Sequence, residues 1–82
     1  MKREIHPQTA ILSTFVYNRR KQFKLSMMAL ARKAGCSYIT IYNLENCEAN
    51  PSWAMAINIL NALDTSLSEF AAWERGNYDE EM

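Results

Sequence analysis

This sequence of 82 residues is poor in the residue types on which many enzyme sites are built. It has two glycines, two cysteines and one histidine. It contains no glycine-rich phosphate loop, no metal-ligand spacing and no nucleophile with a nearby histidine. We therefore expect no enzymatic activity, no cofactor and no metal, and we expect His6 to be solvated. Cys36 and Cys47 fit neither a disulfide framework nor a zinc spacing, so we expect two buried or half-buried thiols in a reducing cytoplasm.

Long hydrophobic runs are missing as well. The first nine residues contain no apolar segment of a secretion signal. No run approaches the roughly 18 apolar residues that a membrane-spanning helix needs. We therefore expect a cytoplasmic protein with no membrane partner. Internal repeats, low-complexity segments and the alternating pattern of strands are also absent, which favours an all-α fold.

A net charge of either sign is missing too, because nine basic residues balance nine acidic ones. The charges are nevertheless unevenly distributed. Residues 1–44 hold eight basic residues and one acidic residue, a net charge of +7, and residues 45–82 hold one basic and eight acidic residues, a net charge of −7. This split predicts one basic and one acidic face. The alternative is two solvated faces of an ordinary soluble domain.

Helical periodicity predicts five helices in one domain over residues 1–82, with an arm at 1–6 and a frayed tail at 77–82. The predicted helices cover residues 7–24, 27–34, 38–45, 53–63 and 66–76. Pro7 suits the first turn of the first helix. The sequence from Ser66 to Glu69 forms a capping box for the last helix, and Gly76 is its expected end.

The first helix has an inner stripe that includes one charged side chain. Its members are Leu12, Phe15, Val16, Arg20 and Phe23. The helix over 53–63 has two apolar stripes, one formed by Met55, Ala56, Ile59, Ala62 and Leu63 and the other by Trp53, Ile57 and Leu60. One small domain rarely buries both, so we expect the second stripe to be a partner surface. In the last helix, we expect Leu67 and Phe70 to face inward and Trp73 to face outward.

Residues 27–46 have the spacing of a helix, a tight turn and a second helix. Ala31 is small enough for the second helix to cross the first at close range. Gly35 suits the left-handed end of the first helix, and Ser26 and Ser37 are good N-cap residues. Ile41 and Leu44 share one inward face of the second helix. The side chains that then point elsewhere are Tyr38, Ile39, Thr40, Tyr42 and Asn43.

The segment from Leu25 to Phe70 resembles the Cro/repressor-type helix-turn-helix family of phage and bacterial regulators. Its most specific elements are Leu44-Glu45-Asn46 and Asn50-Pro51-Ser52. The resemblance implies a compact five-helix lambda-repressor-like domain that binds double-stranded DNA as a homodimer and regulates transcription as a repressor or autoregulator. It also implies an ion pair between Arg20 and Glu45, which we expect to be structural.

In this family the helix over 38–45 is the recognition helix, which enters the major groove. The expected base-reading residues are Tyr38, Ile39, Thr40 and Asn43. Asn43 is suited to adenine and Ile39 to the methyl group of thymine. The expected phosphate contacts are Arg19, Lys21, Lys24, Ser26, Arg32, Lys33 and Asn46. Aromatic anchors dominate protein interfaces, and the expected dimer interface consists of Trp53, Ile57, Leu60 and Trp73.

Two positions depart from the family pattern. Met27 stands where the family often has a glutamine beside the DNA backbone, and the acidic Glu48 stands where many members are basic. The recognition helix also lacks lysine and arginine. These departures and the zero net charge keep a second hypothesis open, in which the fold binds a protein, as an antitoxin-like or anti-repressor partner would.

Overall fold

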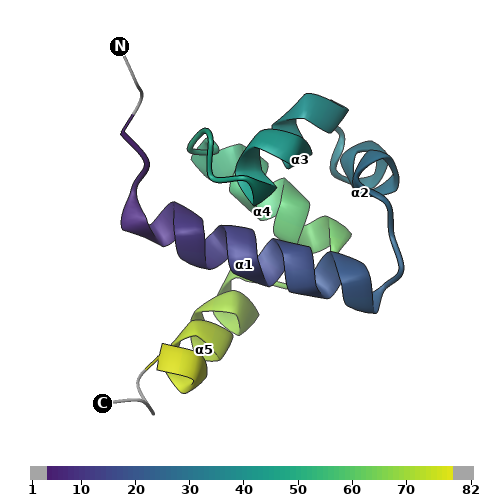
Figure 1. Cartoon of the computed structure of the whole chain (residues 1–82). Coiled ribbons are helices and arrows are strands. Elements are labelled where there is room, and N and C mark those ends of the chain that lie inside the picture. Colours follow the sequence, from purple (N-terminus) through teal and green to yellow (C-terminus); the bar gives the residue numbers. More distant parts are fainter. Residues whose placement is uncertain (1–3, 79–82) are drawn as a thin grey trace.

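Five α-helices make up the described part of the computed structural model, residues 4–78 (Figure 1). They are α1 (Pro7–Gln22), α2 (Met27–Ala34), α3 (Tyr38–Glu45), α4 (Trp53–Ala62) and α5 (Leu67–Tyr78), and residues 4–78 contain no strand. The all-α prediction is confirmed, and each helix begins and ends within two residues of its predicted bounds. Residues 1–3 and 79–82, which belong to the expected arm and tail, lie outside the described residues.

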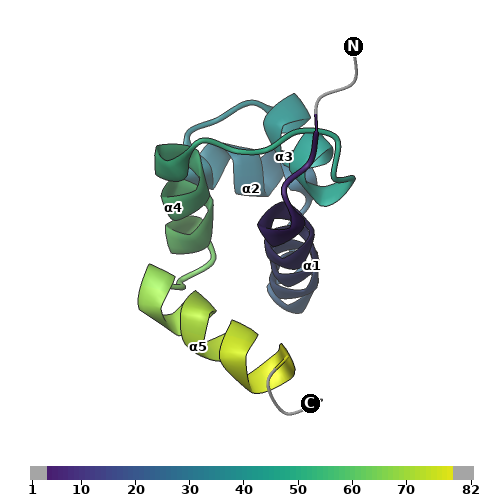
Figure 2. The same ribbon diagram turned by 90° about the vertical axis from the view of Figure 1, so that its left-hand side faces the viewer.

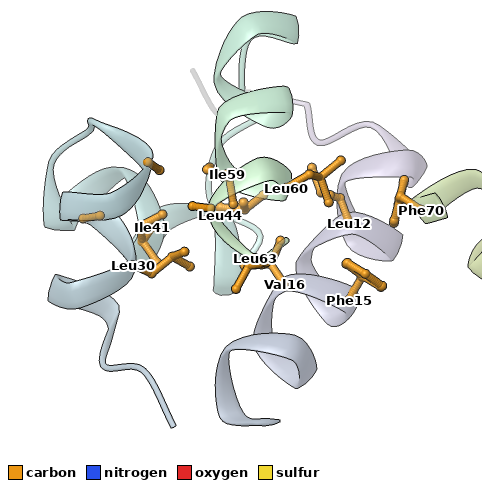
Figure 3. Packing of buried hydrophobic residues seen from close by; sticks show 13 residues of the cluster. Leu12, Phe15, Val16, Leu30, Ile41, Leu44, Ile59, Leu60, Leu63 and Phe70 are labelled. Atoms are coloured by element: carbon orange, nitrogen blue, oxygen red, sulfur yellow. The ribbon is translucent and has the colours of Figure 1, made fainter. Parts of the chain in front are cut away.

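The helices α2 and α3 lie at one end of the molecule and α5 lies at the other, with α1 and α4 between them (Figure 1 and Figure 2). The core fills the space among these helices and takes buried apolar side chains from all five (Figure 3). Its members are Leu12, Phe15, Val16, Leu30, Ala31, Ala34, Ile41, Leu44, Ile59, Leu60, Ala62, Leu63 and Phe70. The outer surfaces of α2 and α3 are thereby left free for a function other than packing.

Four predictions about inner and outer faces were wrong. Leu60 is 1% exposed and belongs to the core rather than to a spare stripe. Phe23 is exposed because α1 ends at Gln22, before it. Leu67 is also exposed, whereas Trp73 is half-buried with its ring 4.8 Å from that of Phe15. The reason is that α5 rests on α1 through the face that carries Trp73.

Serine side chains cap the N-termini of three helices, and two of these caps, at Ser26 and Ser66, were predicted. The Ser26 hydroxyl accepts a hydrogen bond from the Ala29 N–H at 3.0 Å, and Ser52 caps α4 in the same way. In the capping box of α5, the Ser66 N–H donates to the Glu69 carboxylate at 2.9 Å, and the Glu69 N–H donates to the Ser66 hydroxyl at 3.1 Å. These caps satisfy N–H groups that the first turn of a helix leaves without intrahelical partners.

Two helix starts differ from the prediction. The Ser37 hydroxyl makes no capping bond to α3 and lies 3.1 Å from the Thr40 hydroxyl instead. His6 is exposed, as expected, and its Nδ1 also accepts a hydrogen bond from the Gln8 N–H at 3.0 Å, so it caps α1, a role that the sequence did not predict.

Residues just after the ends of α1, α2, α3 and α4 adopt the left-handed backbone conformation, and only one of these residues is a glycine. Gly35 has φ of 74° at the end of α2, as predicted. Lys24, Cys47 and Asp64 adopt the same region with φ of 54° to 56°. Gly76 does not end α5, which continues to Tyr78. Both cysteines are free and half-buried, as expected.

Candidate nucleic-acid interface

The Arg20–Glu45 ion pair joins the end of α1 to the end of α3. Arg20 Nε lies 2.6 Å from Glu45 Oε2 and Arg20 Nη2 lies 2.8 Å from Oε1, so the contact is bidentate. The side chains are 7% and 3% exposed. The hydrogen bond to Glu45 raises the pKa of Arg20 above its usual value, against the effect of burial. The expected pair is therefore confirmed, and it neutralises the only acidic side chain of α3.

A third contact of the same guanidinium extends this link to the loop before α2. Arg20 Nη1 donates a hydrogen bond to the Leu25 carbonyl at 2.9 Å. Nearer the start of α1, the Ser13 hydroxyl donates a hydrogen bond to the backbone carbonyl of Glu45 at 3.0 Å. These bonds hold α1, the start of α2 and the end of α3 in one fixed arrangement, so the outward face of α3 is set by buried polar contacts as well as by the core.

The turn between α2 and α3 sets the angle between the two helices. The N–H groups of Gly35 and Cys36 donate to the carbonyls of Arg32 and Ala31, at 3.3 Å and 2.9 Å, as in a helix end with a left-handed residue. Burial of the Cys36 side chain raises the pKa of its thiol. Ala31 is only 2% exposed, and its small side chain allows the close approach that the sequence predicted.

The outward face of α3 consists of large apolar and aromatic side chains. Tyr38 is 45% exposed, Ile39 55% and Tyr42 38%. The centroids of the two tyrosine rings are 6.1 Å apart, with their planes tilted by 35°. Ile41 and Leu44 occupy the opposite, buried face as predicted. The exposed face thus offers apolar surface and two hydroxyl groups, without a charge.

Two polar side chains lie on the flank of α3 that faces the following loop. Thr40 and Asn43 are half-buried and line a shallow depression of about 260 Å³, together with residues 49–52 and Met55. The Asn43 carbonyl accepts the Glu48 N–H at 2.8 Å, which closes the loop onto the helix. The four predicted base-reading residues therefore divide into an apolar pair, Tyr38 and Ile39, and a polar pair beside the loop.

The exposed cations near α3 come from α2 and from the end of α1. Arg32 and Lys33 are exposed in the last turn of α2. Lys21 and Lys24 are exposed at the end of α1, where the Lys21 ammonium lies 5.6 Å from the Tyr17 ring centroid. Ser26 and Asn46 are exposed but already engaged, because the Asn46 side-chain amide donates to the Tyr42 carbonyl at 2.8 Å.

Arg19 is not placed with these cations. Its guanidinium lies 5.2 Å from the centroid of the Phe15 ring, and the side chain lines a small depression with Trp73 of α5. Its charge also contributes to the lowered pKa of Glu69, which is on α5. Arg19 therefore lies beside α5 and not with the cations near α3, and its predicted phosphate contact stays a prediction.

Asn50 joins the N-terminal residues to the loop after α3, which the sequence did not predict. Its Oδ1 accepts hydrogen bonds from the His6 N–H at 2.9 Å and the Thr9 hydroxyl at 2.6 Å. Its Nδ2 donates to the Glu4 carbonyl at 2.9 Å. The signal available in the sequence was the Asn50-Pro51-Ser52 element, but its partners are more than 40 positions away. This network ties the loop that carries Glu48 to the residues before and at the start of α1.

The expected dimer residues do not form one exposed patch. Trp53 is 70% exposed and Ile57 is half-buried, whereas Leu60 is in the core and Trp73 packs on Phe15. An apolar groove of about 390 Å³ lies among α1, α4 and α5, and Trp53 is one of the residues that line it. Leu12, Leu60 and Phe70 contribute to its lining, with the exposed Leu67 at its edge.

Membrane-spanning helices and metal-binding clusters are absent from residues 4–78. None of the helices there combines the length and apolar character needed to cross a membrane. No group of three or more histidine, cysteine, aspartate or glutamate side chains in this part of the chain is arranged to hold a metal ion.

The comparisons with known proteins identify the family. Residues 16–70 match the model of the helix-turn-helix family HTH_3, which is more than half of the chain, so the protein belongs to this family. The structure is similar to the crystal structure of an HTH_3 family transcriptional regulator from Vibrio cholerae, with a TM-score of 0.73 and 29% sequence identity. The match covers 80% of this chain and 37% of that one, so this chain corresponds to little more than a third of the regulator. No curated protein matches the chain.

Proposed function

We propose that this protein is a sequence-specific, double-stranded DNA-binding transcriptional regulator that reads the major groove with α3. The observation that carries the proposal is the helix-turn-helix of α2 and α3, which lies within the HTH_3 family match: α3 buries Ile41 and Leu44 and leaves its opposite face exposed. The similarity of the structure to the HTH_3 family transcriptional regulator from Vibrio cholerae supports the same function. We further propose that the protein acts as a repressor or autoregulator.

Base reading is assigned to the four predicted residues of α3. The side-chain amide of the half-buried Asn43 can donate a hydrogen bond to adenine N7 through its N–H and accept one from the adenine N6 amino group through its oxygen. Thr40 beside it offers a hydroxyl. Ile39 offers apolar contact to a thymine methyl group. Tyr38, in the first turn of α3, is suited to contact both a base edge and the adjacent phosphate through its hydroxyl.

Phosphate binding is assigned to the cations and polar groups on the same end of the molecule. They are Lys21, Lys24, Ser26, Arg32, Lys33 and Asn46. Such contacts give affinity and register without sequence preference. Glu48 is exposed on the loop after α3 and opposes phosphate, which lowers the affinity for DNA that lacks the preferred sequence.

We also propose that the protein acts as a homodimer on a two-fold operator, through the groove beside Trp53. An isologous interface places the same patch of both subunits in contact. The 70% exposed Trp53 side chain is itself part of the groove's lining, so when two grooves face each other each Trp53 can contact the groove of the second copy. Aromatic side chains seated in apolar pockets are the commonest anchors of protein interfaces.

A second candidate function is a protein-binding module. The apolar, cation-free face of α3 and the acidic Glu48 favour it, because both are unusual for a surface that binds an anionic polymer. A gel-shift titration with the DNA upstream of the protein's own gene separates the two functions. Saturable binding that resists excess random duplex supports the regulator, and its absence at low salt supports the module.

A further inference from the structure

The short helix α3 carries three exposed large apolar or aromatic side chains. Among the described residues, eight large apolar or aromatic side chains are exposed, and three of them, Tyr38, Ile39 and Tyr42, are on this helix of eight residues. Contiguous exposed apolar surface usually marks an interaction site. The neighbouring polar flank, Thr40 and Asn43, is half-buried and therefore less able to dominate the contact.

The chemistry of the helix limits which base edges it can read. Guanine is read most often by arginine or lysine and cytosine by a carboxylate. No residue of α3 is arginine or lysine, and its only carboxylate, Glu45, is 3% exposed and paired with Arg20. The major groove has one apolar group among its base edges, the 5-methyl group of thymine. An isoleucine placed against any other edge would leave polar base atoms without hydrogen bonds, which costs free energy.

We propose that the outward face of α3, formed by Tyr38, Ile39 and Tyr42, binds the 5-methyl groups of pyrimidines, so that the protein selects duplexes by their pattern of thymines. This inference rests on the proposed DNA-binding function and specifies the chemical group that the site recognises. Ile39 is the central reader because it is the most exposed of the three and has no polar atom in its side chain. Cytosine methylated at the 5-position presents the same group at the same place and takes the place of thymine in this contact.

The test compares duplexes that differ only in this methyl group. A duplex enriched from a random library is synthesised with thymine and again with uracil, and each is titrated with the protein by fluorescence anisotropy. Removal of a buried methyl group weakens binding by about fourfold, so one methyl contact in each of the dimer's two half-sites predicts a loss of roughly 15-fold for uracil. At a position where uracil weakens binding, 5-methylcytosine should bind about fourfold more tightly than cytosine.

Two variants of Ile39 separate contact from changes in the DNA itself. Ile39→Val keeps a branched apolar side chain and should retain the preference for thymine over uracil. Ile39→Asn should bring the ratio of the affinities for the thymine and uracil duplexes close to one. The variant should still fold, because this position is more than half exposed. If the preference persists in Ile39→Asn, uracil acts through the shape of the duplex and the inference is wrong.

The remaining outcomes distinguish this inference from the proposed function. Saturable binding with equal affinity for thymine and uracil duplexes contradicts methyl recognition and leaves DNA binding intact. No saturable binding of either duplex at low salt contradicts both, and assigns the apolar face of α3 to a protein partner.

Discussion

Removal of the Glu45 carboxylate should be among the most destabilising single substitutions in this domain. The carboxylate receives two hydrogen bonds from Arg20, at 2.6 Å and 2.8 Å, and the two side chains are 3% and 7% exposed. In Glu45→Ala the guanidinium keeps only its bond to the Leu25 carbonyl. A buried positive charge is then left without a counter-charge, and α1 loses the side-chain link from Arg20 to the end of α3, although the Ser13 hydrogen bond to the backbone carbonyl of residue 45 remains.

The expected magnitude follows from the burial of both partners. Breaking a buried ion pair by removal of one partner costs about 3–5 kcal/mol. The remaining bond of Arg20 to Leu25 favours the lower part of this range. For a domain of this size, a loss of about 3 kcal/mol lowers Tm by roughly 12–24 °C. Since small domains have total stabilities of about 5–15 kcal/mol, the variant should still fold at low temperature.

Thermal and urea unfolding followed by circular dichroism measure this effect at one fixed protein concentration, because dimerisation makes Tm depend on concentration. Glu48→Ala is the matched control, since Glu48 is an exposed glutamate of the adjoining loop and should change stability by no more than about 0.5 kcal/mol. The double variant Arg20→Met, Glu45→Leu should recover most of the loss, because it removes the unpaired charge. A Glu45→Ala protein that unfolds like Glu48→Ala would refute the reasoning about the buried pair.

Three other substitutions test the assignments of base reading, assembly and capping. Asn43→Ala should weaken binding to the selected operator by about 1–3 kcal/mol and relax the preference at one base pair, with little change on random duplex; an equal loss on both would make Asn43 a phosphate contact. Trp53→Ala should shift the protein from dimer to monomer in sedimentation velocity at tens of micromolar, and an unchanged distribution would place the interface elsewhere. Hydrogen bonds from the backbone N–H and the hydroxyl of Ser66 lower the pKa of Glu69, so the stability they give is present above the ordinary glutamate value of 4.5 and is lost as the pH falls through the lower folded value. The stability advantage of wild type over Glu69→Gln should therefore shrink on acidification, and a pH-independent difference would contradict the role of the charge.

Several features with a local signal in the sequence were predicted correctly, although Ser37 makes no capping bond and Gly76 does not end α5. Ser26, Gly35 and the capping box at Ser66 occupy positions where one residue type satisfies a backbone requirement, so no knowledge of the rest of the fold was needed. The Arg20–Glu45 pair joins positions far apart in the chain, and it was accessible only because both residues fall on matching positions of a known family. A charged residue on an apolar stripe was the independent sign that such a partner existed.

The errors concern features that depend on how helices cross. The apolar periodicity of α4 defines two stripes, and the placement of α5 decides which one is buried, so Leu60 was assigned to the wrong surface. The same crossing turns Trp73 onto Phe15 and leaves Leu67 exposed. The Asn50 network was missed because hydrogen bonds between an N-terminal segment and a distant loop leave no periodic pattern.

The salt dependence of duplex binding tests the central claim that one face of this neutral protein binds DNA. Four cationic candidates per protomer remain after Arg19 is set aside: Lys21, Lys24, Arg32 and Lys33. If about five to seven of the eight in a dimer contact phosphates, log K should fall with log salt with a slope of roughly −4.5 to −6, since each contact contributes about −0.9.

The acidic residues do not cancel this effect where they lie farther from the DNA than the Debye length of about 8–10 Å. The measurement is a titration of the enriched duplex at several salt concentrations, with wild type and with Arg32→Ala, Lys33→Ala. The account predicts the steep slope for wild type, and weaker binding with a flatter slope on every sequence for the double variant. A wild-type slope near zero, or no saturable binding of duplex at low salt, would contradict it.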